Sequence, residues 1–129
     1  MFLVNSFLAL CHEAKQKGLP LNRDPGACIG RGFADLGFEV FLCCPQGVLV
    51  SLLTGERSVL RDSETDFFFS VPTVDELCLA LESEKIELVT TERQDQREWY
   101  IELATPSGRK AMATDTELLN ALLKGYLAL

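Results

Sequence analysis

Two short runs of alternating apolar residues, one on each side of Pro45-Gln46-Gly47, constrain the fold most strongly. Residues 38–44 and 48–53 are rich in Phe, Val and Leu and have the two-residue period of a β-strand. Proline favours the second position of a type I turn, and glycine readily takes the positive φ at the end of such a turn. The segment therefore predicts a β-hairpin and, with it, an antiparallel sheet.

Two adjacent cysteines, Cys43 and Cys44, end the first of these runs. Neighbouring side chains of a strand point to opposite faces, so Cys44 should share a face with Leu42 and Cys43 a face with Glu39 and Phe41. A zinc site would need close ligand pairs such as CxxC, and the sequence has none. We interpret both cysteines as strand residues, and we expect Cys43, on the mixed face, to be the more reactive thiol if either has a chemical role.

The first 18 residues are predicted to form an amphipathic helix. Val4, Phe7, Leu8 and Cys11 follow the i, i+3, i+4, i+7 spacing, and Gly18 is placed as a C-cap. Residues 19–37 contain a strong turn signal and several glycines, so we expect a glycine-rich loop there.

The second half of the chain alternates between helical and strand patterns. Residues 58–61 or 67–71 provide a third strand, and Thr73 to Glu76 has the pattern of a capping box that opens a helix ending near residue 84. Strand patterns follow at 86–91, 98–103 and 109–113, with 92–98 expected as a solvated loop. Thr114 to Glu117 again resembles a capping box, before a final helix in which Leu118, Leu119, Leu122 and Tyr126 are expected to point inward.

These patterns predict a single α+β domain over residues 1–129, in the order α-βββ-α-βββ-α, with antiparallel meander sheets packed against helices. A chain of this length can bury a sizeable core. The two Pro-x-Gly turns, at Pro45 and Pro106, lie 61 residues apart and suggest an internal duplication of helix plus meander.

The negative charge is concentrated in the middle of the chain. The net charge is −7, and residues 62–102 alone hold three basic and twelve acidic residues, a net charge of −9. Nucleic acids and anionic membranes need a basic surface, so we expect neither as a partner. Two interpretations of the acidic surface stay open, namely solubility and attraction of a basic partner.

The cellular location is predicted from three features. The apolar start of the chain lacks a preceding basic segment, the five cysteines are odd in number without framework spacing, and no apolar run approaches the length of a membrane span. We expect a cytoplasmic protein.

The sequence offers little to a catalytic interpretation. His12 is the only histidine, and its neighbour Cys11 points about 100° away around the helix, so the two cannot form a dyad. The glycine-rich segment lacks the Lys-Ser/Thr of a phosphate-binding loop. We predict no catalytic, metal-binding or cofactor-binding residues and no cofactor. A cysteine-dependent enzyme is the least favoured alternative.

Apolar residues beyond a single helical stripe suggest a binding surface. The candidates for a partner-binding apolar surface are Phe2, Leu3, Phe7, Leu10, Phe67 and Phe69. We therefore expect a non-enzymatic protein-binding module that forms a homodimer and whose partner is another protein with a basic or apolar binding segment.

Two resemblances extend this prediction. The order of elements, together with GLPLNRDPGAC at residues 18–28, resembles the type III secretion chaperones. That resemblance implies a homodimer without enzymatic activity or cofactor, which holds the extended N-terminal region of a secreted partner in apolar grooves. In the C-terminal half, residues 74–81, WYIEL and ATDTELLNALLKGYL are similar to small α/β sandwich domains of phage proteins, which implies the alternative of a phage or prophage accessory protein.

Overall fold

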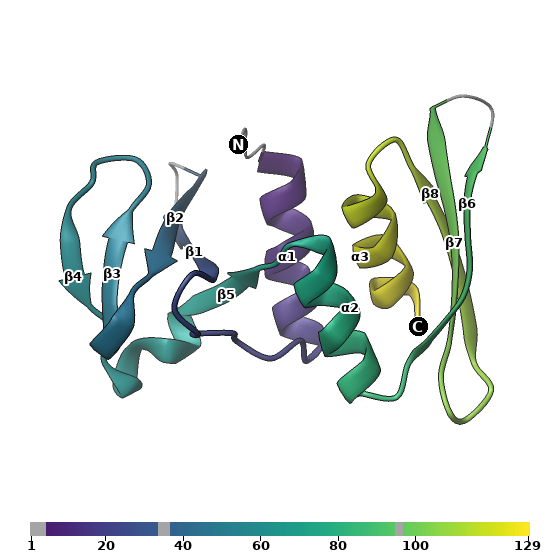
Figure 1. Ribbon diagram of the computed structural model, residues 1–129, viewed down its shortest axis with the longest axis horizontal. Coiled ribbons are helices and arrows are strands. Elements are labelled where there is room, and N and C mark those ends of the chain that lie inside the picture. Colours follow the sequence, from purple (N-terminus) through teal and green to yellow (C-terminus); the bar gives the residue numbers. More distant parts are fainter. Residues whose placement is uncertain (1–4, 34–36, 95–96) are drawn as a thin grey trace. The chain divides into compact units, whose positions relative to one another are not determined.

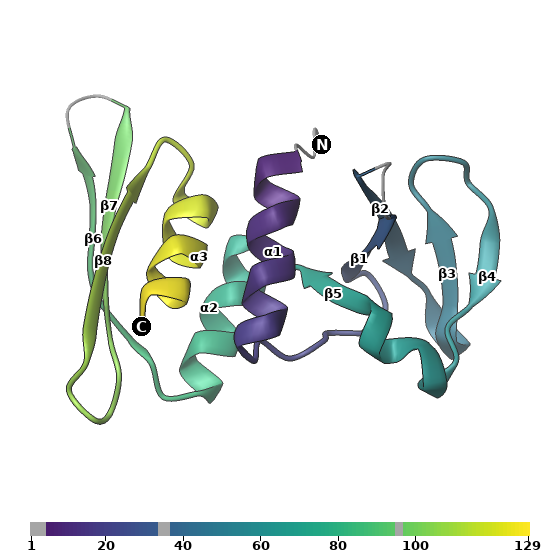
Figure 2. The same cartoon turned by 180° about the vertical axis from the view of Figure 1, so that it is seen from behind.

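The computed structural model describes residues 5–33, 37–94 and 97–129. The protein is α+β, as predicted, with helices and two antiparallel sheets (Figures 1 and 2). Its contacts divide the chain into two compact units, Met1–Pro72 and Thr73–Leu129. That the two units form one domain, and that they arose by duplication, both stay predictions.

Unit 1 contains one helix and a five-stranded antiparallel sheet in the order β4-β3-β2-β1-β5. Its elements are α1 (Asn5–Lys17), β1 (Cys28–Phe33), β2 (Gly37–Cys43), the short 3-10 helix η1 (Pro45–Gly47), β3 (Val48–Ser51), β4 (Arg57–Val59), the 3-10 helix η2 (Asp62–Phe67) and β5 (Phe68–Val71). Both candidates for a third strand are strands, as β4 and β5. The sheet therefore has five strands where the sequence predicted three.

The prediction of a loop over residues 19–37 was wrong at its centre, where β1 runs between β2 and β5. Gly30 of β1 lies directly opposite Phe69 of β5. A Cβ atom at Gly30 would lie 2.6 Å from two carbons of the Phe69 ring. This glycine therefore serves close packing within a strand, where the sequence suggested a turn.

The hairpin of β2 and β3 is confirmed, with Cys43 opposite Leu49. Its turn differs from the predicted type I, because both Gln46 (φ 65°) and Gly47 (φ 75°) have positive φ. The Val48 amide donates to the Pro45 carbonyl, so Gln46 and Gly47 occupy the central positions, as in a type I′ turn. This turn type matches the twist of the paired strands better than type I does.

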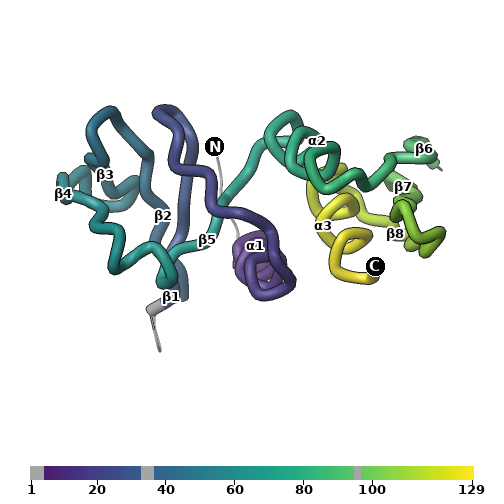
Figure 3. Tube along the Cα trace, turned by 90° about the horizontal axis from the view of Figure 1, so that it is seen from below, coloured from purple at the N-terminus to yellow at the C-terminus, as the bar shows by residue number. Residues whose placement is uncertain are grey.

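The predicted N-terminal helix is confirmed over Asn5–Lys17, with Val4 outside the described residues, and it ends as predicted at Gly18. The Gly18 amide donates to the Lys15 carbonyl (2.9 Å) and the Leu19 amide to the Ala14 carbonyl (2.9 Å), which is a Schellman motif. Lys15 has a further role, because its Nζ donates to the carbonyl oxygens of Thr65, Asp66 and Phe68. The helix is thereby tied to the end of η2 and the start of β5, beside which it lies in Figure 3.

The two faces of the five-stranded sheet carry different side chains. One face holds a buried cluster formed by Ile29, Phe41, Cys43, Leu49, Leu60 and Phe68. On the other face, the Phe69 ring packs edge-on against Phe38, at 5.5 Å between centroids, and lies 5.4 Å from the His12 ring of α1. The core of unit 1 is therefore built on both sides of the sheet.

Unit 2 contains two helices and a three-stranded antiparallel sheet in the order β6-β7-β8. Its elements are α2 (Val74–Ser83), β6 (Glu87–Gln94), β7 (Glu98–Ala104), β8 (Lys110–Asp115) and α3 (Leu118–Ala128). Strand β6 extends through Gln94, into residues that the sequence predicted as loop.

Helix α3 packs on β7 and β8, and Gly125 permits the close approach. A Cβ atom at Gly125 would lie 2.5 Å from Ile101 Cδ1. Leu122 and Tyr126 are buried as predicted, whereas Leu118 and Leu119 are half-buried. Burial and the carboxylate of Glu84, to which the Tyr126 hydroxyl is hydrogen-bonded, raise the pKa of Tyr126 to about 12.

The two predicted capping boxes had different outcomes. At α2 both reciprocal bonds form, from the Glu76 amide to Thr73 Oγ1 (3.2 Å) and from the Thr73 amide to Glu76 Oε1 (2.9 Å). The box at residues 114–117 was wrong, because Thr114 belongs to β8 and the N-cap residue Glu117 makes no side-chain capping bond. The Asp115 carboxylate caps the start of α3 instead. It accepts hydrogen bonds from the Glu117 amide (2.9 Å) and from Lys124 Nζ (2.6 Å).

Within the described ranges, each helix is too short or too polar to cross a membrane.

Candidate protein-binding surfaces

The apolar surface predicted from the sequence is largely buried where the structure describes it. Phe7 is 9% exposed and Phe69 is 1% exposed, so both belong to the core and are wrong as surface residues. Leu10 is half-buried, and Phe67, at 68%, is exposed as predicted. Phe2 and Leu3 lie outside the described residues. The error at Phe69 has a physical reason, because its ring fills the space above Gly30.

Several large apolar side chains that were not predicted from the sequence are also exposed. They are Leu52, Leu53 and Val59 in unit 1 and Leu79, Leu88, Val89 and Met112 in unit 2. Leu52 and Leu53 lie in the turn between β3 and β4, and turns lie at the surface, so the turn signal at Gly55 was usable. Leu88 and Val89 are neighbours on a strand, which sequence patterns alone could not identify as a sheet edge.

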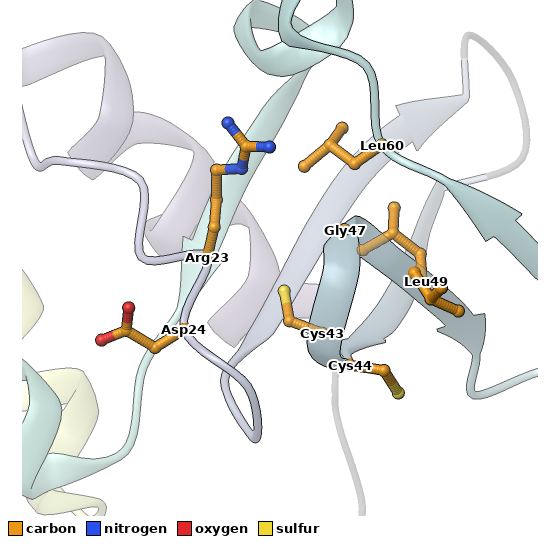
Figure 4. Close-up of a pocket in the computed structure, with 8 residues that line it drawn as sticks. Arg23, Asp24, Cys43, Cys44, Gly47, Leu49 and Leu60 are labelled. Atoms are coloured by element: carbon orange, nitrogen blue, oxygen red, sulfur yellow. The ribbon is translucent and has the colours of Figure 1, made fainter.

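The two adjacent cysteines lie at a pocket of about 360 Å³ in unit 1, lined also by Arg23, Asp24, Leu49 and Leu60 (Figure 4). Their side chains point apart, as the strand alternation predicted. Cys43 is only 3% exposed, and burial together with the neighbouring Cys28 and Cys44 raises its pKa. Burial counts against Cys43 as the more reactive thiol, and the half-buried Cys44 is the more accessible of the two.

A second pocket, of about 230 Å³, lies on the same sheet. Arg31 stacks on the rings of Phe41 and Phe68, at 5.4 and 5.5 Å from their centroids. Its Nη2 lies 3.4 Å from Glu39 Oε1, and Ser51 Oγ donates to Glu39 Oε2 at 2.9 Å. These contacts connect β1, β2 and β3, so the charged side chains at this pocket are explained as a structural link between strands.

The only histidine packs among aromatic rings. The His12 ring lies 6.0 Å from the Phe38 ring and 5.4 Å from the Phe69 ring. Cys11 is fully buried, and burial raises its pKa to about 12, so the thiol holds its proton at neutral pH. Burial therefore makes Cys11 a poor nucleophile. In the part of the chain that the structure describes, His, Cys, Asp and Glu side chains form no group of three suited to a metal ion.

The longest exposed sheet edge belongs to β6 in unit 2. This strand has eight residues, and all of them except Thr90 are exposed. It pairs with β7 on one side only, and its register shifts between Leu88 and Thr90, which leaves Val89 as a bulge. The edges of the other sheet differ, because β4 has three residues and β5 is buried throughout.

The outer face of this three-stranded sheet, opposite α3, is acidic. The register with β7 places Ile101 and Leu103 on the inner face and Glu98 and Glu102 on the outer face. Glu87 and Glu92 of β6 share that outer face, as the partners of Ala104 and Tyr100. Lys110 of β8 is the one cation at the described outer positions of the sheet, and its Nζ lies 3.9 Å from Glu102 Oε1.

Comparisons of the chain with protein-family models, with curated proteins and with solved structures found no match. The assignment of a function therefore depends on the surfaces described above.

Proposed function

We propose that the protein is a non-enzymatic module that binds another polypeptide by adding it as a strand to the edge of β6. The observation that carries the proposal is the eight-residue exposed edge. Each edge strand presents a row of backbone N–H and C=O groups that an extended segment can satisfy.

The composition of β6 supports strand addition. Val89, Thr90 and Thr91 are β-branched residues that favour extended backbone, and the strand contains no proline. Leu88 and Val89 add exposed apolar area at the edge, 39% and 45% exposed respectively. Folded proteins protect exposed edges with short strands, charged side chains, bulges or a covering element. The bulge at Val89 and the charges of β6 restrict which segments can pair there, and a matching polypeptide would cover the exposed apolar area.

Binding of an extended segment is also what the resemblance to secretion chaperones implies. The resemblance implies that the partner lies in apolar grooves, whereas we propose that its backbone pairs with β6.

We also propose that the protein is a homodimer, as the resemblance implies. Light scattering at high micromolar concentration should give twice the 14.3 kDa mass of the chain, and a strictly monomeric mass would count against the chaperone-like interpretation.

The test compares two substitutions at the bulge residue. Val89→Pro removes an amide donor and places a ring on the edge, at a bulge where proline is tolerated in sheets. Val89→Ala also reduces the apolar side chain at this position but keeps the backbone amide N–H. A partner captured from the native host should bind the wild type and Val89→Ala, and should lose binding to a folded Val89→Pro variant.

The outcome that would contradict the proposal is equal binding by all three proteins. If Leu53→Ser abolished binding while Val89→Pro did not, the binding surface would be the exposed turn of unit 1. Circular dichroism of each variant confirms that the fold is retained.

A further inference from the structure

We infer that the segment bound at β6 is basic at every second position, so that its cations lie on the acidic outer face of the sheet. This inference rests on the proposed strand addition at β6. It narrows the expected partner, a protein with a basic or apolar binding segment, to an extended segment that alternates Lys or Arg with apolar or β-branched residues.

The positions of the carboxylates carry the first step. A strand paired with β6 places alternate side chains on the outer face and on the inner face. On the outer face it meets Glu87, Thr90 and Glu92 of β6, whose positions follow from the pairing with β7. Both carboxylates are on exposed residues, and Glu102 of the adjacent strand adds a third. The outer face of β6 and β7 therefore presents three carboxylates next to the added strand.

The inner face of β6 carries a different set of side chains. Leu88, Thr91 and Arg93 face that side, as the partners of Leu103, Ile101 and Trp99. The Arg93 guanidinium stacks on the Trp99 ring, 5.6 Å from its centroid. A cation of the partner on this face would meet Arg93, whereas an apolar or Thr side chain would pack beside Leu88. The two faces thus demand alternating residue types.

This arrangement also selects the register. A slip of one residue moves every side chain to the other face, so it would place the basic residues next to Arg93 and remove them from Glu87 and Glu92. Like charges placed opposite each other in a sheet are destabilising. Charge therefore discriminates between the two alternate registers as well as between partners.

The edge of β8 lacks this complementarity. Its outer positions are Lys110, Met112 and Thr114, and Arg109 precedes the strand. A basic segment would meet like charge at the start of β8. Of the two edges of this sheet, β6 is the one suited to a basic partner.

The experiment uses the full chain and three synthetic peptides with the sequences KVKTKVK, QVQTQVQ and EVETEVE. Trp99 is the only tryptophan and lies on the strand paired with β6, so its emission reports the binding. Chemical shifts of the amides of Glu87–Gln94 locate the binding on the chain. We expect the basic peptide to bind most tightly and the acidic peptide least tightly.

Two double variants isolate the local charges. Glu87→Gln with Glu92→Gln should weaken binding of the basic peptide by about 2- to 30-fold, the range for two exposed ion pairs. Glu13→Gln with Glu82→Gln makes the same change in net charge at exposed positions of the helices and should leave the affinity within about 2-fold of the wild type. Raising NaCl from about 0.1 M to about 1 M should remove most of the difference between the basic and neutral peptides, because the Debye length falls from about 10 Å to about 3 Å.

The outcomes separate the inference from the proposed function. If the neutral peptide binds β6 as tightly as the basic one, the inference is overturned and strand addition stands. If the two double variants weaken binding equally, net charge and not the outer face is responsible, and the inference is again overturned. If none of the peptides shifts the amides of β6, strand addition itself is refuted.

Discussion

Replacement of Gly30 by alanine should destabilise unit 1, whereas the same replacement at Gly32, two residues further along β1, should not. An ideal Cβ at Gly30 would lie 2.6 Å from two ring carbons of Phe69 and 3.3 Å from Val71 Cγ2. Carbon atoms in favourable contact are about 3.5–4.0 Å apart, so the ring would have to move by about 1 Å. At Gly32 the nearest atoms belong to Phe38, at 3.8 Å and 3.9 Å, which is ordinary contact.

The surroundings of Phe69 decide the size of the effect. The residue is 1% exposed, and its ring is held between Phe38 and His12, so it has little room to move away from β1. Overpacking of this kind costs about 1–3 kcal/mol. Alanine also gains about 0.5–1 kcal/mol over glycine in a strand, and this gain is common to both sites. The difference in unfolding free energy between Gly30→Ala and Gly32→Ala should therefore be about 1–3 kcal/mol.

Urea denaturation followed by far-UV circular dichroism measures this difference, since the only tryptophan lies in unit 2. A double variant, Gly30→Ala with Phe69→Leu, provides the control, because the smaller side chain removes the ring that causes the overlap. Its loss of stability should be less than the sum of the two single losses. If Gly30→Ala proved as stable as Gly32→Ala, or if the two substitutions at positions 30 and 69 were additive, the packing argument would be refuted.

Three further predictions follow from the contacts of single side chains. Lys15→Met should cost about 1.5–3 kcal/mol in urea denaturation, because its ammonium donates to three carbonyl oxygens, while Lys17→Met, on an exposed residue of the same helix, should cost about 0.5 kcal/mol. Asp115 is partly desolvated, which raises its pKa, but its bonds with Lys124 and with the Glu117 amide outweigh this and lower the pKa overall. Its contribution to stability should therefore be fully present above the ordinary pKa of aspartate and be lost as the pH falls through the lowered value, so the stability difference between the wild type and Asp115→Asn, followed by thermal unfolding across pH 2 to 7, should narrow in acid. In the folded protein iodoacetamide should alkylate Cys44 and spare the buried Cys43, which peptide mass spectrometry resolves, and equal labelling of both would show that the pocket opens readily.

Structural features that depend on neighbouring residues were predicted correctly from the sequence. The hairpin around Gly47 and the capping box at Thr73 each depend on residues within a few positions of one another, and both are confirmed. The C-cap at Gly18 is of the same kind. Such features are predictable because their physical cause lies within the segment itself.

Features that depend on distant residues were missed. Gly30 looked like a loop residue because the side chain that requires it, Phe69, is 39 positions further along the chain. The cap of α3 was misplaced because Asp115, at the end of β8, accepts the capping hydrogen bond that the pattern assigned to Thr114. Phe69 itself was selected as surface because a run of phenylalanines does not show which side of a sheet each one faces.

The candidate site shows the same division. A strand over residues 86–91 was predicted from local composition, but its extension through Gln94 and its position at the edge of a sheet were not. An edge is a property of strand order, which the sequence of one strand does not contain. The acidity of residues 62–102 was evident from the sequence, yet only the register with β7 shows which carboxylates share a face.

The position of β5 affects how the chain can fold during synthesis. Strands β1 to β4 form a continuous meander, but the second neighbour of β1 is β5, which lies about 40 residues later in the sequence. Chains emerge from the ribosome at about 5–20 residues per second, so β1 waits about 2–8 seconds for residues 68–71. During that interval one side of β1 is an open edge, and nascent chains close together could pair there. The glycines of β1, which have low strand propensity, reduce the risk of such pairing until Phe69 arrives to cover Gly30.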